Sequence, residues 1–427
     1  MKVEHPDFGS LPSTWSVLTL GDVADVTKLA GFEFTKHIKY LEDGEIIALR
    51  SLNVCDGQLD LSKAKRISKD ASNALPRSKL FVGDLLLTYT GSKLGDTAII
   101  DCNDKYHLAP NVCRLRAIND TDAYFLYLYM RSAVFIRILD NFKVGSGQPT
   151  VPMKNIRKIP IPWPCEDERN LICDVYKSLN NKIVTNVSIN ISLEEIAKAI
   201  FKSWFVDFDP IKAKMRGELP EGMDAATAAL FTDKLVESEL GLIPEGWEVK
   251  SFSDWVKITK GKNITKKTVI EGDIPVVAGG LKPAYFHNTH NVEGPAITIS
   301  ASGANAGFVS LYFQNIWASD CSYISESTTP FFYLQYVFLV FNQKKIFGMQ
   351  TGAAQPHIYP RDFERLMVVI PNEELCIKLE NIFASFFRGI ANNKAQNIEL
   401  SQLRDTLLPK LLSGERELTN LEPKDES

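Results

Sequence analysis

Two long stretches of the chain repeat a hydrophobic position every seven residues, which predicts long amphipathic helices of the coiled-coil kind. In the first stretch the repeating positions are Ile172, Leu179, Asn186, Leu193 and Ile200, with Val175, Ile183, Ile189, Ile196 and Trp204 between them. In the second stretch, 207 residues later, they are Leu379, Phe386, Asn393, Leu400 and Leu407, flanked by Ile382, Ile390, Leu403 and Leu411. We expect spacer helices over residues 166–209 and 372–413, each on the order of 60 Å long.

The segment that precedes each long helix has a different pattern. Short runs of β-branched or aromatic residues, such as 84–89 (DLLLTY) and 296–300 (AITIS), are followed by glycine-rich turns. This pattern is typical of a mixed α/β (α+β) globule. We therefore expect two globules, over residues 1–165 and 243–371.

Within each globule the sequence predicts one aromatic-rich helix, over residues 123–139 in the first and 331–347 in the second. Prolines at positions 160, 162 and 164 close the first globule, and Pro371 closes the second, because proline cannot continue a β ladder. Residues 210–242 are expected to link the two halves, and residues 414–427 to form a flexible acidic tail.

The chain contains an internal duplication. The string Leu-Pro-Ser-Thr-Trp ending at Trp15 is echoed by Ile-Pro-Glu-Gly-Trp ending at Trp247, an offset of 232, and residues 22–28 fall on 254–260 at the same offset. The offset is 212 for Gly91 and Gly303, and it is 207 from Gly145 and Gly352 onward. The landmarks keep their order, so the second copy is about 25 residues shorter than the first. Two like globules on two like helices can pack with pseudo-two-fold symmetry if the helices run antiparallel.

Asn186 and Asn393 occupy the same position of the two predicted helices. An asparagine in a helix seam lowers stability but fixes the register and the partner number, because only one alignment satisfies its amide. The alternative is that both residues lie in a loosely packed, wet part of the seam.

Composition is that of a folded protein, with 45% hydrophobic residues and a net charge of −4. The seven cysteines form no Cys-x-x-Cys pair, which favours a reducing cytoplasm, and no apolar run is long enough to span a membrane. The first globule carries 21 Lys and Arg against 18 Asp and Glu, and the second carries 11 against 10. The net charge does not favour a DNA-binding protein and favours a protein scaffold instead. The globules are nevertheless mildly basic, by a small margin, and the connecting segments are acidic, a distribution that suits globules on DNA and helices on protein.

The known catalytic motifs are missing from the sequence. There is no Gly-x-x-x-x-Gly-Lys-Ser/Thr loop for ATP, and no Asn-Pro-Pro-aromatic string of an amino-methyltransferase. His287 and His290 are expected in a surface loop rather than in a metal site. Asp207 and Asp209 are expected to cap or dock a helix, and the cysteines to be buried structural thiols. We therefore expect no catalytic residue, no metal and no cofactor in this chain.

Two separate surfaces at a fixed distance can recognise two half-sites of duplex DNA. Polar and basic residues in glycine-rich or irregular loops suit phosphates and base edges, since Lys and Arg bind phosphate oxygens and guanine, and Asn and Gln pair with adenine. The candidates are Arg66, Tyr89, Ser92, Lys93 and Lys143 in the first globule, and Lys262, Lys266, Lys267, Asn305 and Gln350 in the second.

The order globule, helix, globule, helix resembles the specificity subunit of Type I restriction-modification systems. The local strings do so as well: Trp15 with residues 20–22 (LGD), residues 147–149 (GQP) before 159–162 (IPIP), and residues 200–210 (IFKSWFVDFDP) after the first helix. The second copy lacks the last string and has Lys410-Leu-Leu-Ser-Gly instead, so the partner contacts of the two copies need not be equivalent.

The resemblance implies that each globule is a target-recognition domain for one half of a bipartite site in double-stranded DNA. It implies that the helices dock two methyltransferase (modification) subunits, that restriction subunits (ATP-driven nucleases) complete the complex, and that S-adenosylmethionine, ATP and Mg are bound by those partners. A second hypothesis is a duplicated coiled-coil scaffold that organises proteins without reading DNA. An enzyme with its site between the globules is the least favoured, because the catalytic motifs are missing.

Overall fold

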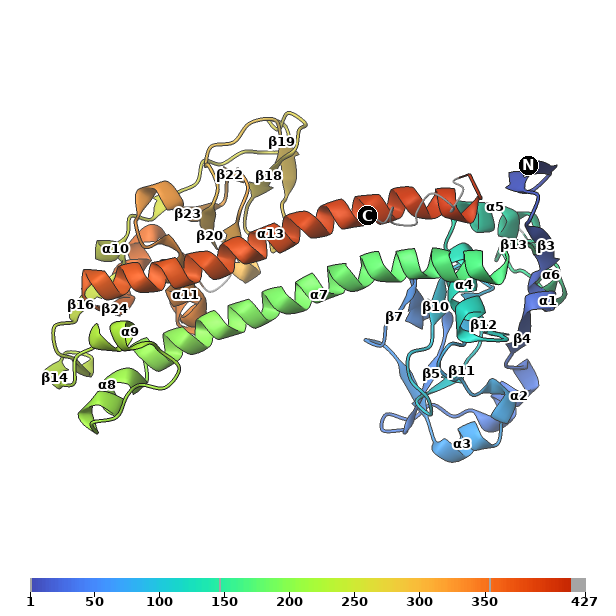
Figure 1. Cartoon of the computed structure of the whole chain (residues 1–427), viewed down its shortest axis with the longest axis horizontal. Helices are drawn as coiled ribbons and strands as arrows, with labels where there is room; N and C mark the ends of the chain where they lie inside the picture. The colour runs from blue at the N-terminus through green and yellow to red at the C-terminus, as the bar shows by residue number, and fades with distance from the viewer. Residues whose placement is uncertain (1, 146, 353–354, 416–427) are drawn as a thin grey trace, which may run out of the picture. The chain divides into compact units, whose positions relative to one another are not determined.

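The computed structural model describes residues 2–145, 147–352 and 355–415. The chain divides into two compact units, one made of residues 1–183 with 398–427 and the other of residues 184–397. Each unit therefore contains one globule and parts of both long helices (Figure 1). Most of the predicted tail, residues 416–427, lies outside the described residues.

The first globule contains two main sheets and three two-stranded ribbons. The four-stranded sheet has the order β10 (Thr97–Ile99), β9 (Leu85–Thr88), β12 (Val112–Ala117), β4 (Ala24–Lys28). The three-stranded sheet has the order β11 (Tyr106–Leu108), β5 (Ile46–Leu49), β8 (Lys65–Ile67). The ribbons are β1 (Lys2–His5) with β2 (Gly9–Pro12), β3 (Ser16–Thr19) with β13 (Pro160–Trp163), and β6 (Val54–Cys55) with β7 (Gln58–Leu59).

The second globule repeats the topology of both main sheets and of two of the three ribbons. Its four-stranded sheet has the order β21 (Val309–Tyr312), β20 (Ala296–Ser300), β23 (Cys321–Ser325), β17 (Thr259–Lys260). Its three-stranded sheet has the order β22 (Trp317–Ala318), β18 (Ile274–Val277), β19 (Tyr285–His287). The ribbons are β14 (Leu235–Ser238) with β15 (Gly241–Pro244), and β16 (Glu248–Ser251) with β24 (Met367–Ile370). The β6–β7 ribbon has no counterpart in the described part of this globule, which accounts for part of its shorter length.

Each globule contains a strand that is buried along its whole length, and each of these strands lies in one of the short apolar runs seen in the sequence. All four residues of β9 and all five of β20 are buried. A strand that is buried on both faces is a continuous apolar run rather than an alternating one. In each globule the main sheet lies between two hydrophobic clusters, and the small sheet packs against one of them.

The prediction of one aromatic helix per globule is wrong, because each is divided into two. The pairs are α4 (Asp120–Met130) with α5 (Ala133–Asn141), and α11 (Phe332–Phe341) with α12 (Gln343–Gly348). The break in the first globule is at Ser132, whose hydroxyl accepts a hydrogen bond from the Phe135 N–H at 3.2 Å. Serine in this position caps a new helix and thereby ends the preceding one.

The shorter helices and 3-10 turns connect the strands. In the first globule they are α1 (Leu20–Val23), α2 (Gly31–His37), η1 (Ser51–Asn53), α3 (Lys69–Asn73), η2 (Pro76–Ser78) and α6 (Met153–Arg157). In the second they are α10 (Phe252–Trp255), η3 (Gly303–Asn305), η4 (Glu326–Thr328) and η5 (Pro360–Arg365). Residues 210–242, expected as a linker, include α9 (Ala225–Ala229), most of α8 (Asp209–Met215) and the hairpin strand β14.

The prolines at positions 160 and 162 do not stop a β ladder, as the sequence had suggested. Both lie inside β13, which pairs antiparallel with β3 through Pro160↔Thr19 and Pro162↔Val17. The strand belongs to a two-stranded ribbon, and proline is tolerated on an edge strand where its missing N–H faces away from the partner.

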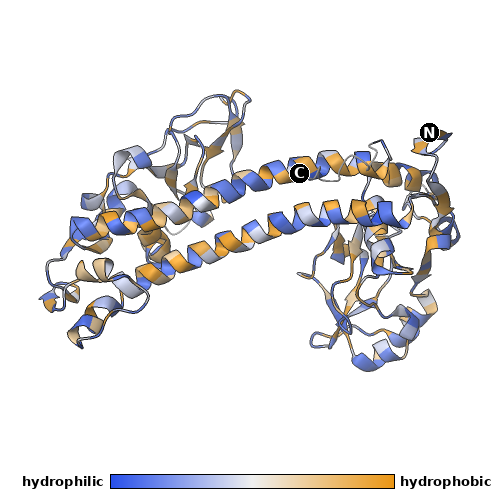
Figure 2. Cartoon of the chain, in the orientation of Figure 1, coloured by the Kyte–Doolittle hydropathy of each residue, from blue (hydrophilic) through white to orange (hydrophobic). Residues whose placement is uncertain are grey.

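The two long helices are continuous and closely follow the predicted bounds: α7 spans Glu166–Phe205 and α13 spans Glu373–Leu412 (Figure 1). Hydrophobic and hydrophilic residues are interspersed along both of them (Figure 2). They run antiparallel within each unit. In the first unit Arg404 lies beside Asn180, and in the second Gly389 lies beside Leu193.

The second row of seam residues differs from the prediction. Ile189, Ile196 and Leu403 are exposed. The row that is buried or half-buried has five residues on each helix. They are Tyr176, Ile183, Asn190, Ala197 and Trp204 on α7, and Phe383, Ile390, Asn397, Arg404 and Leu411 on α13. These residues match one another at the offset of 207, so the duplication holds for the seam as well.

The C-terminal end of each long helix completes the core of a globule. Leu411 and Leu412 of α13 are buried in the first globule's core together with Trp15. Phe201 and Phe205 of α7 occupy the second globule's core, where the Phe205 ring lies 5.4 Å from that of Trp247. The repeated tryptophan of the sequence is thus a docking residue for a helix end.

Truncating one buried side chain at the end of α13 tests this arrangement. We expect Leu411→Ala to lower the free energy of unfolding of the first unit by about 2–5 kcal/mol, because Leu411 is only 2% exposed. The neighbouring Lys410→Ala, at an exposed position, serves as control and should change it by less than about 0.5 kcal/mol. Denaturant unfolding of both variants measures the difference, and equal stabilities would contradict the docking role.

Candidate nucleic-acid interface

Two loops of the first globule are held together by backbone hydrogen bonds, and we call residues 89–96 together with the described residues 144–145 and 147–151 the first loop pair. The Gly91 N–H donates to the Pro149 carbonyl at 3.0 Å, and the Val151 N–H donates to the Tyr89 carbonyl at 2.9 Å. Val144 and Thr150 exchange two further bonds, of 2.8 and 3.0 Å. Segments that lie far apart in the sequence therefore form one surface feature.

The second globule contains the same arrangement, and we call residues 301–308 together with the described residues 351–352 and 355–358 the second loop pair. Gly303 donates to Pro356 at 3.0 Å, and Ile358 donates to Ala301 at 3.0 Å. Thr351 and His357 exchange bonds of 2.9 and 2.8 Å, as Val144 and Thr150 do in the first pair. Loops with different side chains thus share one backbone framework.

Glycines make both frameworks possible. Gly95 and Gly307 have φ angles of +100° and +85°, which residues with a side chain rarely adopt. A Cβ at either position would lie 3.0 Å from an isoleucine side chain, Ile136 in the first globule and Ile346 in the second. The repeated glycines therefore have a structural role, and the neighbouring side chains remain free to differ.

A cation lies over an aromatic ring beside the first loop pair. The Lys28 Nζ is 5.3 Å from the centre of the Tyr89 ring. Lys28 is at the end of β4, opposite Cys113 on β12. Tyr89 is half-buried, and this burial raises the pKa of its hydroxyl. The pair presents a positive charge and a neutral hydroxyl, which suit a phosphate and a base edge, respectively.

The second loop pair has a denser cluster of the same kind, centred on Tyr359. The Lys260 Nζ lies 6.0 Å from the centre of its ring, and the Arg361 guanidinium lies 5.5 Å from it. The His357 ring is stacked on the Tyr359 ring, with 6.0 Å between centroids and an interplanar angle of 11°. Lys260 and Arg361 are exposed, so their charges are available to a ligand.

Of these residues, only Tyr89 was among the candidates predicted from the sequence. A signal was present for one pair: Lys28 and Lys260 match at the offset of 232. Their proximity to Tyr89 and Tyr359 depends on strand pairing and loop contacts, which no local pattern indicates.

The predicted residues of the first globule are only partly brought together. Tyr89 and Ser92 belong to the first loop pair, with Ser92 exposed, and Lys143 precedes it and pairs with Asp140. Lys93 is tied back by a 3.1 Å hydrogen bond from its Nζ to the Val54 carbonyl. Arg66 lies elsewhere, on β8 of the small sheet, where it donates to the Gly44 carbonyl at 3.1 Å.

In the second globule the two predicted amides are bonded to backbone. The Gln350 Nε2 donates to the Ala306 carbonyl at 2.6 Å, and the Asn305 Nδ2 donates to the Gly279 carbonyl at 3.4 Å. Lys262, Lys266 and Lys267 are exposed in the segment that follows β17. Both amides hold the second loop pair in place, while the three lysines are free to meet phosphates.

The predicted register residues lie in a polar layer of the helix seam, in the second unit. The Asn186 Nδ2 donates to the side-chain oxygens of Gln396 and Asn397, both at 2.8 Å, and the Asn393 Nδ2 donates to Asn190 Oδ1 at 2.9 Å. The bond between Asn186 and Asn397 and the bond between Asn393 and Asn190 are related to each other by the duplication, because Asn393 and Asn397 lie 207 residues after Asn186 and Asn190. One axial register satisfies both bonds at once, which is the condition for a register-setting layer.

Some expectations about catalytic chemistry are corrected by the structure. His287 is buried at 5% exposure on β19, with its ring 5.0 Å from that of Trp317, and does not lie in a surface loop. Cys55, Cys102 and Cys165 are exposed, whereas the other four cysteines are buried as expected. Burial raises the pKa of the Cys113 and Cys321 thiols to about 12, so these two are protonated at neutral pH.

The remaining expectations concern metals, membranes and paired acids. In the described ranges, His, Cys, Asp and Glu side chains form no group of three that could hold a metal ion. No helix among the described residues is long and apolar enough to cross a membrane. Asp207 pairs with Lys202, and Asp209 accepts a hydrogen bond from Ser203 at 2.8 Å, so both acids are bound at the end of α7.

Two topologically equal globules, each with its own loop pair and joined through paired helices, define a duplicated recognition protein. The family model described as "Type I restriction modification DNA specificity domain" matches residues 12–195 and 244–402. The match covers well over half of the chain, which therefore belongs to this family. The chain is a DNA sequence-specificity subunit rather than an enzyme, and the resemblance seen in the sequence is confirmed.

Named relatives agree with this assignment over the full length. The chain is 23% identical to the Type I restriction enzyme HindI specificity subunit of Haemophilus influenzae, over 94% of this chain and 100% of that protein. It is 24% identical to the MjaIX specificity subunit of Methanocaldococcus jannaschii, over 98% and 97%. The crystal structure of the Type I restriction-modification S subunit from M. genitalium has the same fold, with a TM-score of 0.58 at 16% identity, over 93% of this chain and 96% of that one.

Removing one amide from the polar layer tests its role. We expect Asn186→Ala to lower the free energy of unfolding by about 1–3 kcal/mol, because the side-chain oxygens of Gln396 and Asn397 lose a shared, buried donor. Ser188→Ala, at an exposed position of the same helix, is the control. Denaturant unfolding of both variants measures the difference, and an unchanged stability would mean that the layer is wet and loose.

Proposed function

We propose that each globule binds one half of an asymmetric bipartite DNA site. The observation that carries this proposal is the repeated loop pair: one backbone framework occurs twice, with different side chains on each copy. A shared framework gives both globules the same way of approaching a duplex, and different side chains give them different base preferences. The proposed domains are residues 1–165 and 243–371, with the hairpin β14–β15 extending the second one to Leu235.

The DNA-facing surface of each globule is proposed to be its loop pair with the adjacent cations. In the first globule this surface includes Lys28, Tyr89, Ser92 and Lys143. In the second it includes Lys260, Lys262, Tyr359 and Arg361, with Lys266 and Lys267 nearby. A lysine or arginine that lies over a tyrosine ring has its charge at a defined position. Phosphate contacts from such a charge favour one position of the globule along the DNA.

The paired helices are proposed to set the spacing between half-sites and to dock modification subunits. The polar layer supports the first role, because it defines one axial alignment. Exposed apolar side chains support the second: Val184, Val187 and Ile191 of α7 are 56%, 47% and 54% exposed, at helical spacing. Two methyltransferase subunits, together with restriction subunits in the full complex, would supply S-adenosylmethionine, ATP and Mg sites.

The experiment that tests this function is base-resolution mapping of DNA methylation in cells that carry this chain with its neighbouring genes. Deletion of this chain alone is the comparison. We expect an asymmetric bipartite motif that loses its methylation on deletion. An unchanged methylation pattern while the partner subunits are present and active would refute the proposal.

The cluster around Tyr359 allows a test within one globule. We expect Lys260→Ala with Arg361→Ala to weaken DNA binding and to reduce the slope of log K against log salt by about two, since each lost phosphate contact contributes about one. Lys250→Ala, an exposed lysine on β16, serves as control. Titration of a labelled duplex at several salt concentrations measures the slope, and equal slopes would remove the cluster from the interface.

A further inference from the structure

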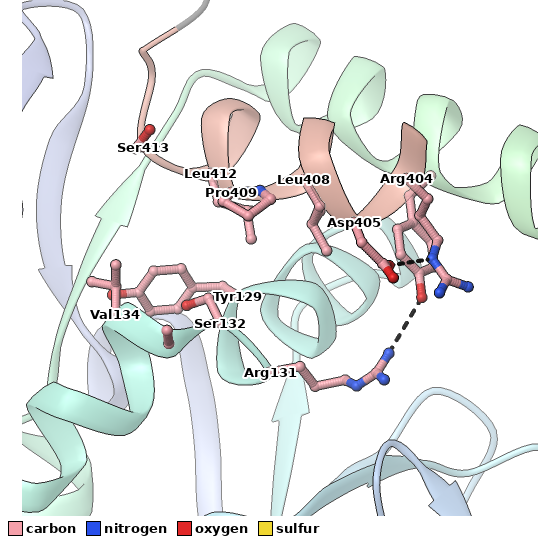
Figure 3. A pocket seen from close by; sticks show the side chains of 12 residues that line it. Tyr129, Arg131, Ser132, Val134, Arg404, Asp405, Leu408, Pro409, Leu412 and Ser413 are labelled. Atoms are coloured by element: carbon pink, nitrogen blue, oxygen red, sulfur yellow. Dashed lines mark hydrogen bonds and ion pairs between the residues drawn. The ribbon is translucent and has the colours of Figure 1, made fainter. Parts of the chain in front are cut away.

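A cavity of about 280 Å³ lies in the first unit, where the end of α13 meets the break between α4 and α5 (Figure 3). Leu408, Leu412 and Ser413 line it from α13 and the residue after it, and Arg131 and Val134 line it from the helix break. Its walls are mainly apolar, with guanidinium groups at the side. It lies apart from the first loop pair, whose residues do not line it.

The second unit has a cavity of about 320 Å³ at the equivalent place. Phe201, Phe205 and Val206 line it, and they match Leu408, Leu412 and Ser413 at the offset of 207. Asn342, the residue before α12, lines it from the break between α11 and α12, as Ser132, the residue before α5, lines the first cavity, and Lys345 of α12 lines it as well. Both copies of the duplication therefore contain a cavity at the end of a long helix, beside a break between two shorter helices.

In the first cavity Arg404 pairs with the Asp405 carboxylate at 2.8 Å, whereas Arg131 and Tyr129 lack a strong partner. The Arg131 guanidinium donates to the Tyr127 and Tyr176 hydroxyls at 3.2 and 3.3 Å, and the carboxylate of Asp56, which is almost fully exposed, is 3.7 Å away. The Tyr129 side chain is 1% exposed, lines the cavity, and has a hydroxyl without a hydrogen-bond partner. A buried hydroxyl of this kind gains free energy when a ligand supplies a partner.

The surroundings of the second cavity are apolar and open. Val206, Leu240 and Leu242 line it and are 46%, 49% and 54% exposed. Adjacent exposed side chains of this kind mark a surface that a protein partner covers. Lys345, also exposed, is the cation beside it.

We infer that the two cavities are equivalent docking sites for the same segment of the modification subunit, an apolar or aromatic side chain with a carboxylate next to it. The inference rests on the proposed function and names where its partner binds. Cavities of this size with apolar walls can hold one large side chain of a partner protein as an anchor. The cation beside each cavity favours a partner segment with an acidic residue next to that anchor. Two matching cavities in one chain account for two copies of one partner.

Filling each cavity separately tests the inference. Ala133→Trp adds bulk at an exposed lining residue of the first cavity, and Leu242→Trp does so in the second. The full chain is mixed with the modification subunit, and the mass of the complex is measured by native mass spectrometry. We expect two copies bound to the unaltered chain, one to each single variant and none to the double variant, with affinity at the filled site roughly 10- to 100-fold weaker.

Matched controls place tryptophan nearby but outside the cavities. Asn141→Trp lies at the end of α5 and Glu237→Trp on β14, both at exposed positions, and both should leave two copies bound. Thermal unfolding checks that every variant is folded. Lys345→Glu should weaken the second site alone, and more strongly at low salt than at high salt.

The outcomes separate the inference from the function on which it rests. Filled, folded variants that still bind two copies would overturn the inference and leave the proposed docking on the helices intact. An unaltered chain that binds no modification subunit would overturn both. If filling changes the association of this chain with itself instead, the occupant is a second copy of the chain and the inference fails.

Discussion

The structure depends on one packing constraint: the core of each globule is closed by the end of a long helix from the opposite half of the sequence. Leu411 and Leu412 fill the first core beside Trp15, and Phe201 and Phe205 fill the second beside Trp247. A globule without that helix end would expose several large apolar side chains, which is costly in water. Folding of either recognition surface is therefore coupled to pairing of α7 with α13.

The same packing constraint distinguishes the side chains that are needed for the fold from the side chains that can change without disturbing it. The loop pairs are held by backbone hydrogen bonds and by glycines with positive φ, so their framework tolerates changes in most side chains. The polar layer of the seam is held by side-chain amides, so a change there has a structural cost. Recognition can therefore diverge between the two copies while their placement on the helices is maintained.

The sequence predicted the long helices because apolar positions that recur every seven residues over five repeats fit one face of a helix and do not fit a strand. It misassigned the inner row next to the main one, since Val175 and Tyr176, or Ile189 and Asn190, compete for the same side of the helix. Hydrophobicity favoured Ile189, whereas the structure buries Asn190 because its amide is bonded across the seam. The proximity of Lys28 to Tyr89, or of Arg131 to Arg404, arises from contacts between distant segments and has no local pattern.

The end of α13 also lies against the start of the chain. The turn at Gly414, with a φ of +64°, lies so close to Pro12 that a Cβ at Gly414 would overlap the proline ring. The last described turn therefore lies beside the first hairpin, much as the end of α7 leads through α8 into the hairpin β14–β15. Within the first unit the first hairpin and the end of α13 are therefore neighbours, and in the second unit the hairpin β14–β15 and the end of α7 line the same cavity.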